Sequence, residues 1–173
     1  HLYVQERVHN PGWLEEGLAE YFGGSSWDPE KRKMTPGLTQ EGRLVNLQEA
    51  MDGKEFQKLE PLLKQPRIDA LQYAWSWALC HMLFHTKKYE SGFNAFINKI
   101  AKDKNLPKEP WPAGADFRWV KPDTQIDLLK KCLGVKDLAV LEQEWYDYIR
   151  SMEVKSARGY YRAAGDCERW ERP

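Results

Sequence analysis

The strongest basis for a fold prediction is residues 10–24, Asn10-Pro11-Gly12-Trp13-Leu14-Glu15-Glu16-Gly17-Leu18-Ala19-Glu20-Tyr21-Phe22-Gly23-Gly24. Asn10 can cap a helix and Pro11 suits its first position. Gly23-Gly24 can end it. Apolar residues recur at helical spacing between these signals: Trp13, Leu14, Leu18, Tyr21 and Phe22. We therefore predict a helix over residues 13–22 whose apolar face is buried.

Two glutamates, Glu16 and Glu20, stand four residues apart and so share one face of this helix. No Lys or Arg lies between Trp13 and Gly24 to neutralise them, which predicts that a cation approaches from elsewhere. Glu15, about 100° round the helix from Glu16, is expected to face solvent. The alternative is that the glutamates only complement the helix dipole and share this spacing by chance.

The pattern Trp-Leu-x-Glu-Gly-x-Ala-x-Tyr-Phe resembles the second ligand helix of the gluzincin metallopeptidases. In the aminopeptidase N and thermolysin families this helix follows a His-Glu-x-x-His helix, and its glutamate is the third zinc ligand. The resemblance gives that role to Glu16, and gives Glu20 the role of a carboxylate that orients a ligand histidine. It also implies that Gly17 permits close helix packing and that Trp13 forms a wall of the site.

His1 is the second predicted zinc ligand. It precedes residues 2–9, which we expect to continue a helix, and the resemblance makes it the last histidine of a His-Glu-x-x-His motif whose first four residues lie upstream. The fifteen residues from His1 to Glu16 are fewer than in thermolysin or aminopeptidase N and fit the compact peptidase-MA-like group. Glu20 is the alternative ligand. The other interpretation of His1 is a remnant of a purification tag.

Tyr73 is the predicted catalytic residue. The stretch Gln72-Tyr73-Ala74-Trp75-Ser76-Trp77-Ala78-Leu79 resembles a Tyr-Glu-Lys-Gly-x-Ala-Leu motif of the aminopeptidase N family. There the tyrosine hydroxyl stabilises the tetrahedral oxyanion opposite zinc, a role that suits a phenol donor in a dry cleft. The alternative is a core tyrosine in an apolar helix.

A second histidine pair, His81 and His85, has the spacing of a helical metal chelate. Met82 follows His81 where a zincin motif has its glutamate, so this is not that motif. We predict that both are ordinary residues of a buried helix.

The composition bounds the class of protein. The 173 residues suit one domain, and the equal counts of 26 basic and 26 acidic residues give no electrostatic basis for nucleic-acid binding. No apolar run reaches transmembrane length, so no membrane insertion is expected. The three scattered cysteines argue against a cysteine-built zinc site and a dense disulfide framework.

Only α-helices are predicted along the rest of the chain. The expected helices are 44–51, 56–64, 67–87, 89–102, 123–133 and 135–152. The helix at 67–87 is apolar round most of its circumference and is therefore expected to be central. Residues 23–42 and 105–122 are predicted loops, and the first has the length of a cleft rim or lid.

These patterns lead to one prediction of fold and function. The chain is expected to be all-α: the helical C-terminal part of a zincin-like metallopeptidase domain at 1–152, followed by a tail at 153–173. The resemblance implies a zinc-dependent peptidase of the bacterial envelope that acts on a peptide or protein substrate, with zinc held by His1 and Glu16. Without the start of the His-Glu-x-x-His motif, this chain is expected to be inactive.

Two other functions remain open. One is a non-catalytic helical domain with a degenerate gluzincin fold that binds a peptide or a polysaccharide. The other, supported only by the abundance of Trp, is a structural interaction domain.

Overall fold

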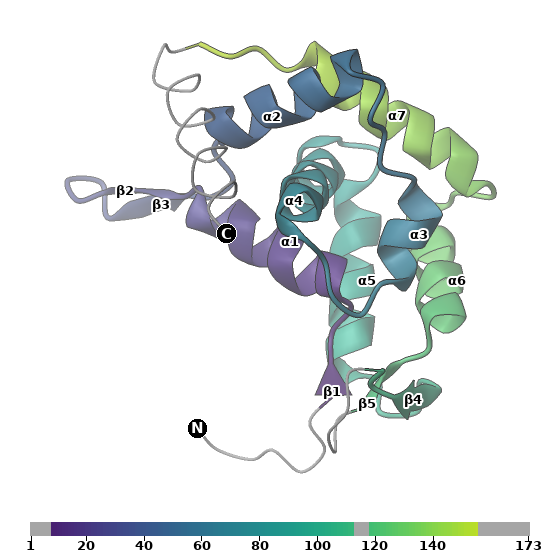
Figure 1. Cartoon of the computed structure of the whole chain (residues 1–173). Coiled ribbons are helices and arrows are strands. Elements are labelled where there is room, and N and C mark those ends of the chain that lie inside the picture. Colours follow the sequence, from purple (N-terminus) through teal and green to yellow (C-terminus); the bar gives the residue numbers. More distant parts are fainter. Residues whose placement is uncertain (1–7, 113–117, 156–173) are drawn as a thin grey trace.

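The computed structural model describes residues 8–112 and 118–155 (Figure 1). Over these ranges the helices are α1 (Gly12–Gly23), α2 (Glu41–Asp52), α3 (Leu59–Lys64), α4 (Ala70–His85), α5 (Glu90–Lys102), α6 (Pro122–Leu133) and α7 (Leu138–Ser151). The strands are β1 (Val8–His9), β2 (Ser26–Asp28), β3 (Lys33–Thr35), β4 (Lys108–Pro110) and β5 (Arg118–Val120). The described chain is mostly helical, which confirms an α-rich fold. The prediction that only helices occur is wrong.

Helix α4 lies at the centre of the molecule, with other helices packed around it (Figure 1). Its residues 74–83 are all buried, as their apolar pattern predicts. Trp75 of α4 contacts Trp145 of α7 edge to face, with 5.1 Å between the ring centroids, and both side chains are buried. Large aromatic side chains therefore join the first and last parts of the described chain in one core.

A three-stranded sheet lies at one end of the molecule. Strand β1 pairs in parallel with β5, with Val8 opposite Arg118, and β5 pairs antiparallel with β4. The prediction of a helix up to residue 9 is therefore wrong for Val8 and His9; residues 2–7 lie outside the described chain. The pairing partner of β1 is 110 residues away in the sequence, so no local pattern predicts this strand.

A hairpin formed by β2 and β3 replaces part of the loop predicted at 23–42 and projects from the helical body (Figure 1). Its turn is set by Asp28, whose carboxylate accepts hydrogen bonds from the backbone N–H groups of Glu30 and Lys31 at 3.1 and 3.0 Å. Trp27 pairs with Met34 across the strands, and both side chains are exposed.

Two helices begin at other residues than predicted, because their first turns are fixed by residues that the prediction did not use as caps. Helix α4 begins at Ala70, after a capping box between Asp69 and Gln72, and not at residue 67. Helix α6 begins with Pro122 as its first residue, so Asp123 lies inside the helix. Its predicted end is confirmed, since Gly134 caps it in the left-handed conformation at a φ of 68°.

Two further observations concern the surface and the end of the described chain. Across residues 8–112 and 118–155, no helix combines the length and the apolar character needed to cross a bilayer. Of the predicted tail at 153–173, residues 153–155 are described. The backbone N–H of Lys155 donates a hydrogen bond of 2.8 Å to the Glu41 carboxylate of α2.

Candidate functional site

Helices α1 and α4 cross at Gly17 with no room for a side chain. A Cβ atom placed on Gly17 would lie 2.7 Å from the Sγ of Cys80 and 2.7 Å from the carbonyl oxygen of Ser76. The predicted role of Gly17 in close helix packing is thus confirmed. This contact brings the glutamate face of α1 next to the first turns of α4, where Tyr73 lies.

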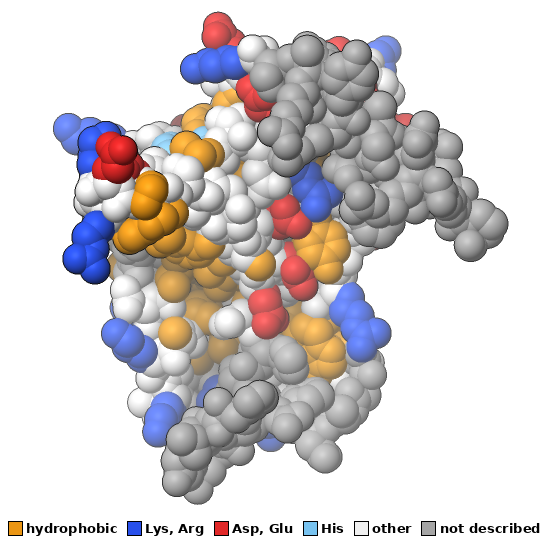
Figure 2. All heavy atoms as spheres, turned by 90° about the vertical axis from the view of Figure 1, so that its left-hand side faces the viewer, with side chains coloured by type: hydrophobic (Ala, Val, Ile, Leu, Met, Phe, Trp, Pro, Cys, Tyr) orange, Lys and Arg blue, Asp and Glu red, His pale blue; other side chains and the backbone are white. Residues whose placement is uncertain are grey.

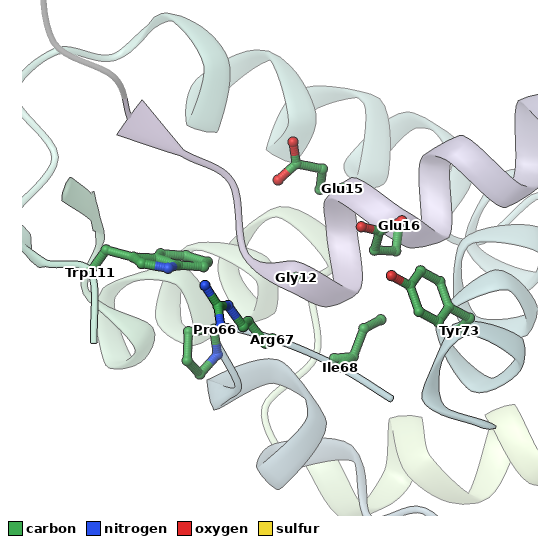
Figure 3. Close-up of a pocket in the computed structure, with 8 residues that line it drawn as sticks. All are labelled: Gly12, Glu15, Glu16, Pro66, Arg67, Ile68, Tyr73 and Trp111. Atoms are coloured by element: carbon green, nitrogen blue, oxygen red, sulfur yellow. The ribbon is translucent and has the colours of Figure 1, made fainter. Parts of the chain in front are cut away.

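Glu16 and Tyr73 face each other across the two helices (Figure 3). The Tyr73 hydroxyl is directed toward the Glu16 carboxylate. Burial of the phenol raises the pKa of Tyr73, and the negative charges of Glu16 and Glu20 raise it further, against an opposing effect of Arg43. Tyr73 is therefore a neutral phenol near pH 7 and can act as a hydrogen-bond donor.

These two residues line a cavity of about 280 Å³. Its lining residues are Gly12, Glu15, Glu16, Pro66, Arg67, Ile68, Tyr73 and Trp111. Figure 3 shows that Glu16 and Tyr73 lie on one side, whereas Arg67 extends toward Trp111 on the other. The face turned to the viewer in Figure 2 accordingly carries acidic side chains close to hydrophobic and basic ones. The cavity is therefore amphipathic and has charges of both signs.

The wall formed by Trp111 depends on the small sheet. Trp111 directly follows β4, and its ring contacts the ring of Trp119 in β5 edge to face, with 5.2 Å between centroids. Trp119 is buried, so it holds the Trp111 ring from behind. Because β5 also pairs with β1, which leads into α1, the sheet links this wall to the helix that carries Glu16.

Glu20 does not line the cavity, but lies one turn further along α1 and is held by α2. Its Oε1 accepts a hydrogen bond of 2.9 Å from Nη2 of Arg43, and both side chains are mostly buried. The side-chain amide of Gln40 donates to the Glu20 backbone carbonyl. Arg43 thus provides a cation for Glu20. The cation predicted for Glu16 stays a prediction. The role of Glu20 toward a ligand histidine stays a prediction.

The predictions for Glu15 and Trp13 have opposite outcomes. Glu15 is exposed, as expected, although it also borders the cavity. The prediction that Trp13 walls the site is wrong. Its side chain is 1% exposed and lies against Phe93 and Phe96 of α5, with ring centroids 6.5 and 6.1 Å away. Trp13 points into the core because its face of α1 is the apolar one.

Of the two predicted zinc ligands, Glu16 lies in the described part of the chain, as does the alternative ligand Glu20. His1 lies outside the described residues. Within the described ranges, no three His, Cys, Asp or Glu side chains come together in a way that could hold a metal ion. Since zinc sites in proteins use three or four protein ligands, Glu16 would need histidines from outside these ranges. The zinc prediction therefore stays a prediction.

The histidines near the end of α4 form a separate cluster. His81 is buried, and its Nδ1 and the Tyr148 hydroxyl are 2.7 Å apart. Burial lowers the pKa of His81 to about 4, with a further contribution from His85. The His85 ring stacks on that of His81 at 4.2 Å, and its Nε2 lies 3.2 Å from the Tyr21 hydroxyl. His85 is exposed, so the prediction of a buried residue holds for His81 alone.

Sequence reasoning missed Arg67 and Trp111 as residues of the site. The capping box of Asp69 and Gln72 was the available signal for Arg67, because it starts α4 at Ala70 and leaves Arg67 in a connecting segment. No comparable signal exists for Trp111. Its position depends on the pairing of β4 with β5, which the sequence did not predict.

Comparison with known proteins gives one match. No curated protein and no solved structure matches this chain. A family model matches residues 2–107, more than half of the 173 residues, and this range includes Glu16, Glu20, Arg67 and Tyr73. The chain therefore belongs to the family described as "Protein of unknown function (DUF1570)".

Proposed function

We propose that this chain carries one half of a gluzincin-type zinc peptidase site, in which Glu16 is a zinc ligand and Tyr73 is the oxyanion donor. The observation that carries the proposal is that the Tyr73 hydroxyl faces the Glu16 carboxylate at the edge of an open cavity. These are the two residues to which the resemblance gives metal-binding and catalytic roles. The fold brings them together from two different helices, α1 and α4.

Zinc would be held by Glu16 together with histidines of a His-Glu-x-x-His motif that ends at His1. A carboxylate oxygen is an ordinary zinc ligand, and Glu16 is partly exposed at the cavity, where a cation can reach it. When bound, zinc supplies a Lewis acid that polarises a peptide carbonyl and makes water more acidic. The glutamate of the motif is the proposed general base.

Tyr73 would turn its hydroxyl from Glu16 to the oxygen of the scissile carbonyl as negative charge develops there. Its raised pKa keeps the proton on the phenol, so the group can donate throughout. Loss of one such donor lowers the rate by about 10²–10³ in enzymes of this kind. Arg43 would hold the Glu20 carboxylate in place, so that Glu20 can orient a ligand histidine as proposed.

Zinc titration of matched glutamate variants tests the ligand role. In a protein that contains the whole predicted His-Glu-x-x-His motif, we expect Glu16→Gln to weaken zinc binding at least about tenfold in isothermal titration, because a carboxylate ligand is lost. Glu15→Gln is the control, since Glu15 is the adjacent glutamate, is exposed and borders the same cavity. Equal zinc affinity of the two variants would rule out Glu16 as a ligand.

Peptide hydrolysis tests the catalytic role in a protein that contains the whole predicted His-Glu-x-x-His motif. We expect cleavage that a zinc chelator abolishes and that Tyr73→Phe reduces by about 10²–10³ in kcat. A Tyr73→Phe variant with unchanged kcat would remove Tyr73 from the mechanism.

A non-catalytic binding domain is the second candidate, and the apolar wall of Trp111, Ile68 and Pro66 favours it. Such a wall suits a peptide or a sugar ring irrespective of any metal. Zinc-independent binding of a peptide that an intact motif never cleaves would support this alternative.

A further inference from the structure

Arg67 has a position that the proposed reaction does not use. It lies between α3 and α4, its side chain is exposed, and it lines the cavity opposite Glu16 and Tyr73 (Figure 3). The described part of the chain provides no hydrogen bond or ion pair to its guanidinium. Glu15 and Glu16 line the same cavity but form no ion pair with this guanidinium. The guanidinium can therefore bind an anionic group of a ligand.

The backbone that carries Arg67 is fixed on both sides. A Cβ atom on Gly12 would lie 3.0 Å from the carbonyl oxygen of Pro66, so the first turn of α1 packs directly on this segment. On the other side, Asp69 and Gln72 exchange hydrogen bonds of 2.9 and 3.0 Å that hold the start of α4. Since the backbone at Arg67 is already ordered, binding through this residue has a smaller entropic cost than binding through a residue on a free loop.

The charges of the cavity determine how a ligand would lie in it. Glu15 and Glu16 would repel a carboxylate, whereas Arg67 would bind one in a bidentate contact. Trp111 lies beside Arg67 and is held by the buried Trp119, so an apolar group can pack next to the bound anion. The cavity therefore fits a ligand with a carboxylate at one end, an apolar group beside it and an uncharged or cationic part near Glu16.

We propose that Arg67 makes this cavity selective for peptides that carry a carboxylate next to an apolar residue, with the carboxylate bound by the guanidinium and the apolar side chain against Trp111. This inference rests on the proposed function in one respect, namely that the ligand is a peptide. The carboxylate has two possible sources, the carboxyl terminus of the peptide or the side chain of an Asp or Glu.

Three fluorescein-labelled peptides test the proposal in a fluorescence-anisotropy titration of the whole chain. The first ends in Ala-Phe with a free carboxyl terminus, the second is its carboxamide, and the third is a carboxamide with Glu beside the Phe. We expect the free carboxyl or the Glu side chain to improve the affinity at least about tenfold over the plain carboxamide. The tighter binder of the two identifies the source of the carboxylate.

Variants of Arg67 show whether the preference belongs to this residue. Arg67→Gln is expected to abolish the preference for a carboxylate, and Arg67→Lys to retain part of it. Arg150→Gln is the matched control, because Arg150 is also exposed but lies on α7 outside the cavity. Equal affinity of the wild-type chain for all three peptides, no binding of any of them, or a preference that survives Arg67→Gln would overturn the proposal.

A Glu16→Gln variant separates this inference from the peptidase proposal, since the titration requires neither zinc nor turnover. A carboxylate preference that persists in Glu16→Gln would show that the Arg67 site does not depend on the proposed zinc ligand. The same preference in a protein that keeps Glu16 and the whole predicted His-Glu-x-x-His motif, but neither binds zinc nor cleaves peptides, would leave the Arg67 site standing and remove the peptidase function. Zinc-dependent cleavage without any carboxylate preference would have the opposite meaning.

Discussion

Both ends of α4 carry polar side chains, but one end borders an open cavity and the other lies in the core. Near its start, Tyr73 faces Glu16 of α1 at the edge of an open cavity. Near its end, His81 is buried and forms a hydrogen bond with the Tyr148 hydroxyl. Both are polar groups of one central helix or its neighbours, but Tyr73 and Glu16 are accessible to a ligand whereas His81 is not.

This difference separates polar groups that stabilise the fold from those available for binding. A buried ring such as that of His81 must have its nitrogen atoms satisfied inside the protein, so it is committed to its partners. Tyr73 and Glu16 are partly exposed, and each can exchange its present partner for a ligand at little cost. The pattern His-x-x-x-His at the end of α4 is the more familiar metal motif, yet the accessible site lies at the start of α4, where Tyr73 faces Glu16 of α1.

The largest expected effect is on the pH dependence of stability at the buried end. His81 has a folded pKa of about 4 against an ordinary 6.5, so between these values the unfolded chain binds a proton that the folded chain does not. Stability is therefore fully present above pH 6.5 and falls by roughly 3 kcal/mol as the pH drops to 4. Urea unfolding of wild type and His81→Gln from pH 4 to 7.5 measures this term as the difference in slope.

His85→Gln is the control for this measurement. Because the charge of His85 is only the second cause of the low His81 pKa, this variant should reduce the slope without abolishing it. If His81→Gln has the slope of wild type, His81 is not the group that titrates.

The second prediction concerns Gly17, where α1 and α4 touch and on which both ends depend. Gly17→Ala places a methyl group against Cys80 and the Ser76 backbone, and we expect a loss of about 1–3 kcal/mol in the free energy of unfolding. Gly23→Ala is the control on the same helix, since no atom lies within 4 Å of the added Cβ. Denaturant midpoints that shift equally in the two variants would contradict the close crossing.

The third prediction compares two tyrosines. Tyr148→Phe leaves Nδ1 of the buried His81 without its partner, and should cost about 1–3 kcal/mol of stability. Tyr73→Phe leaves Glu16 in contact with solvent, and should change stability by about 0.5 kcal/mol or less. Thermal unfolding of both variants at pH 7 gives the comparison directly. A larger loss for Tyr73→Phe would mean that the cavity end, too, is structural.

The smallest expected effect is the coupling between Arg43 and Glu20. Their side chains are 19% and 23% exposed, so a double-mutant cycle with Arg43→Met and Glu20→Gln should give a coupling free energy of up to about 1 kcal/mol. The ion pair of Lys31 with Asp28 in the hairpin, at 77% and 39% exposure, is expected to give no measurable coupling. Similar couplings for the two pairs would show that burial does not strengthen the Arg43 contact.

The parts of the fold that the sequence predicted are those with a strong local pattern. The apolar circumference of α4 predicted its burial, and the glycines after Phe22 predicted the end of α1. Strands of two or three residues are too short to show a periodicity, and β1 exists only because β5 pairs with it. The hairpin was missed because its turn depends on the Asp28 side chain rather than on Gly or Asn.

The candidate site was predicted in part for the same reason. Glu16 and Tyr73 each lie in a helix with a recognisable sequence pattern, and the structure brings them together. Arg43, Arg67 and Trp111 reach their positions through helix packing, a braced linker and a sheet, all of which depend on contacts distant in the sequence. The positions of such residues cannot be predicted from local sequence patterns.

The parallel pairing of Val8 with Arg118 has a consequence for the order of events during synthesis. The segment that leads into α1 is translated 110 residues before its hydrogen-bonding partner. Trp75 likewise waits for Trp145. A nascent chain that ends at residue 107, where the family match ends, would therefore present unpaired strand edges and uncovered aromatic surface. The Trp111 wall of the cavity would be braced only after Trp119 of β5 had emerged.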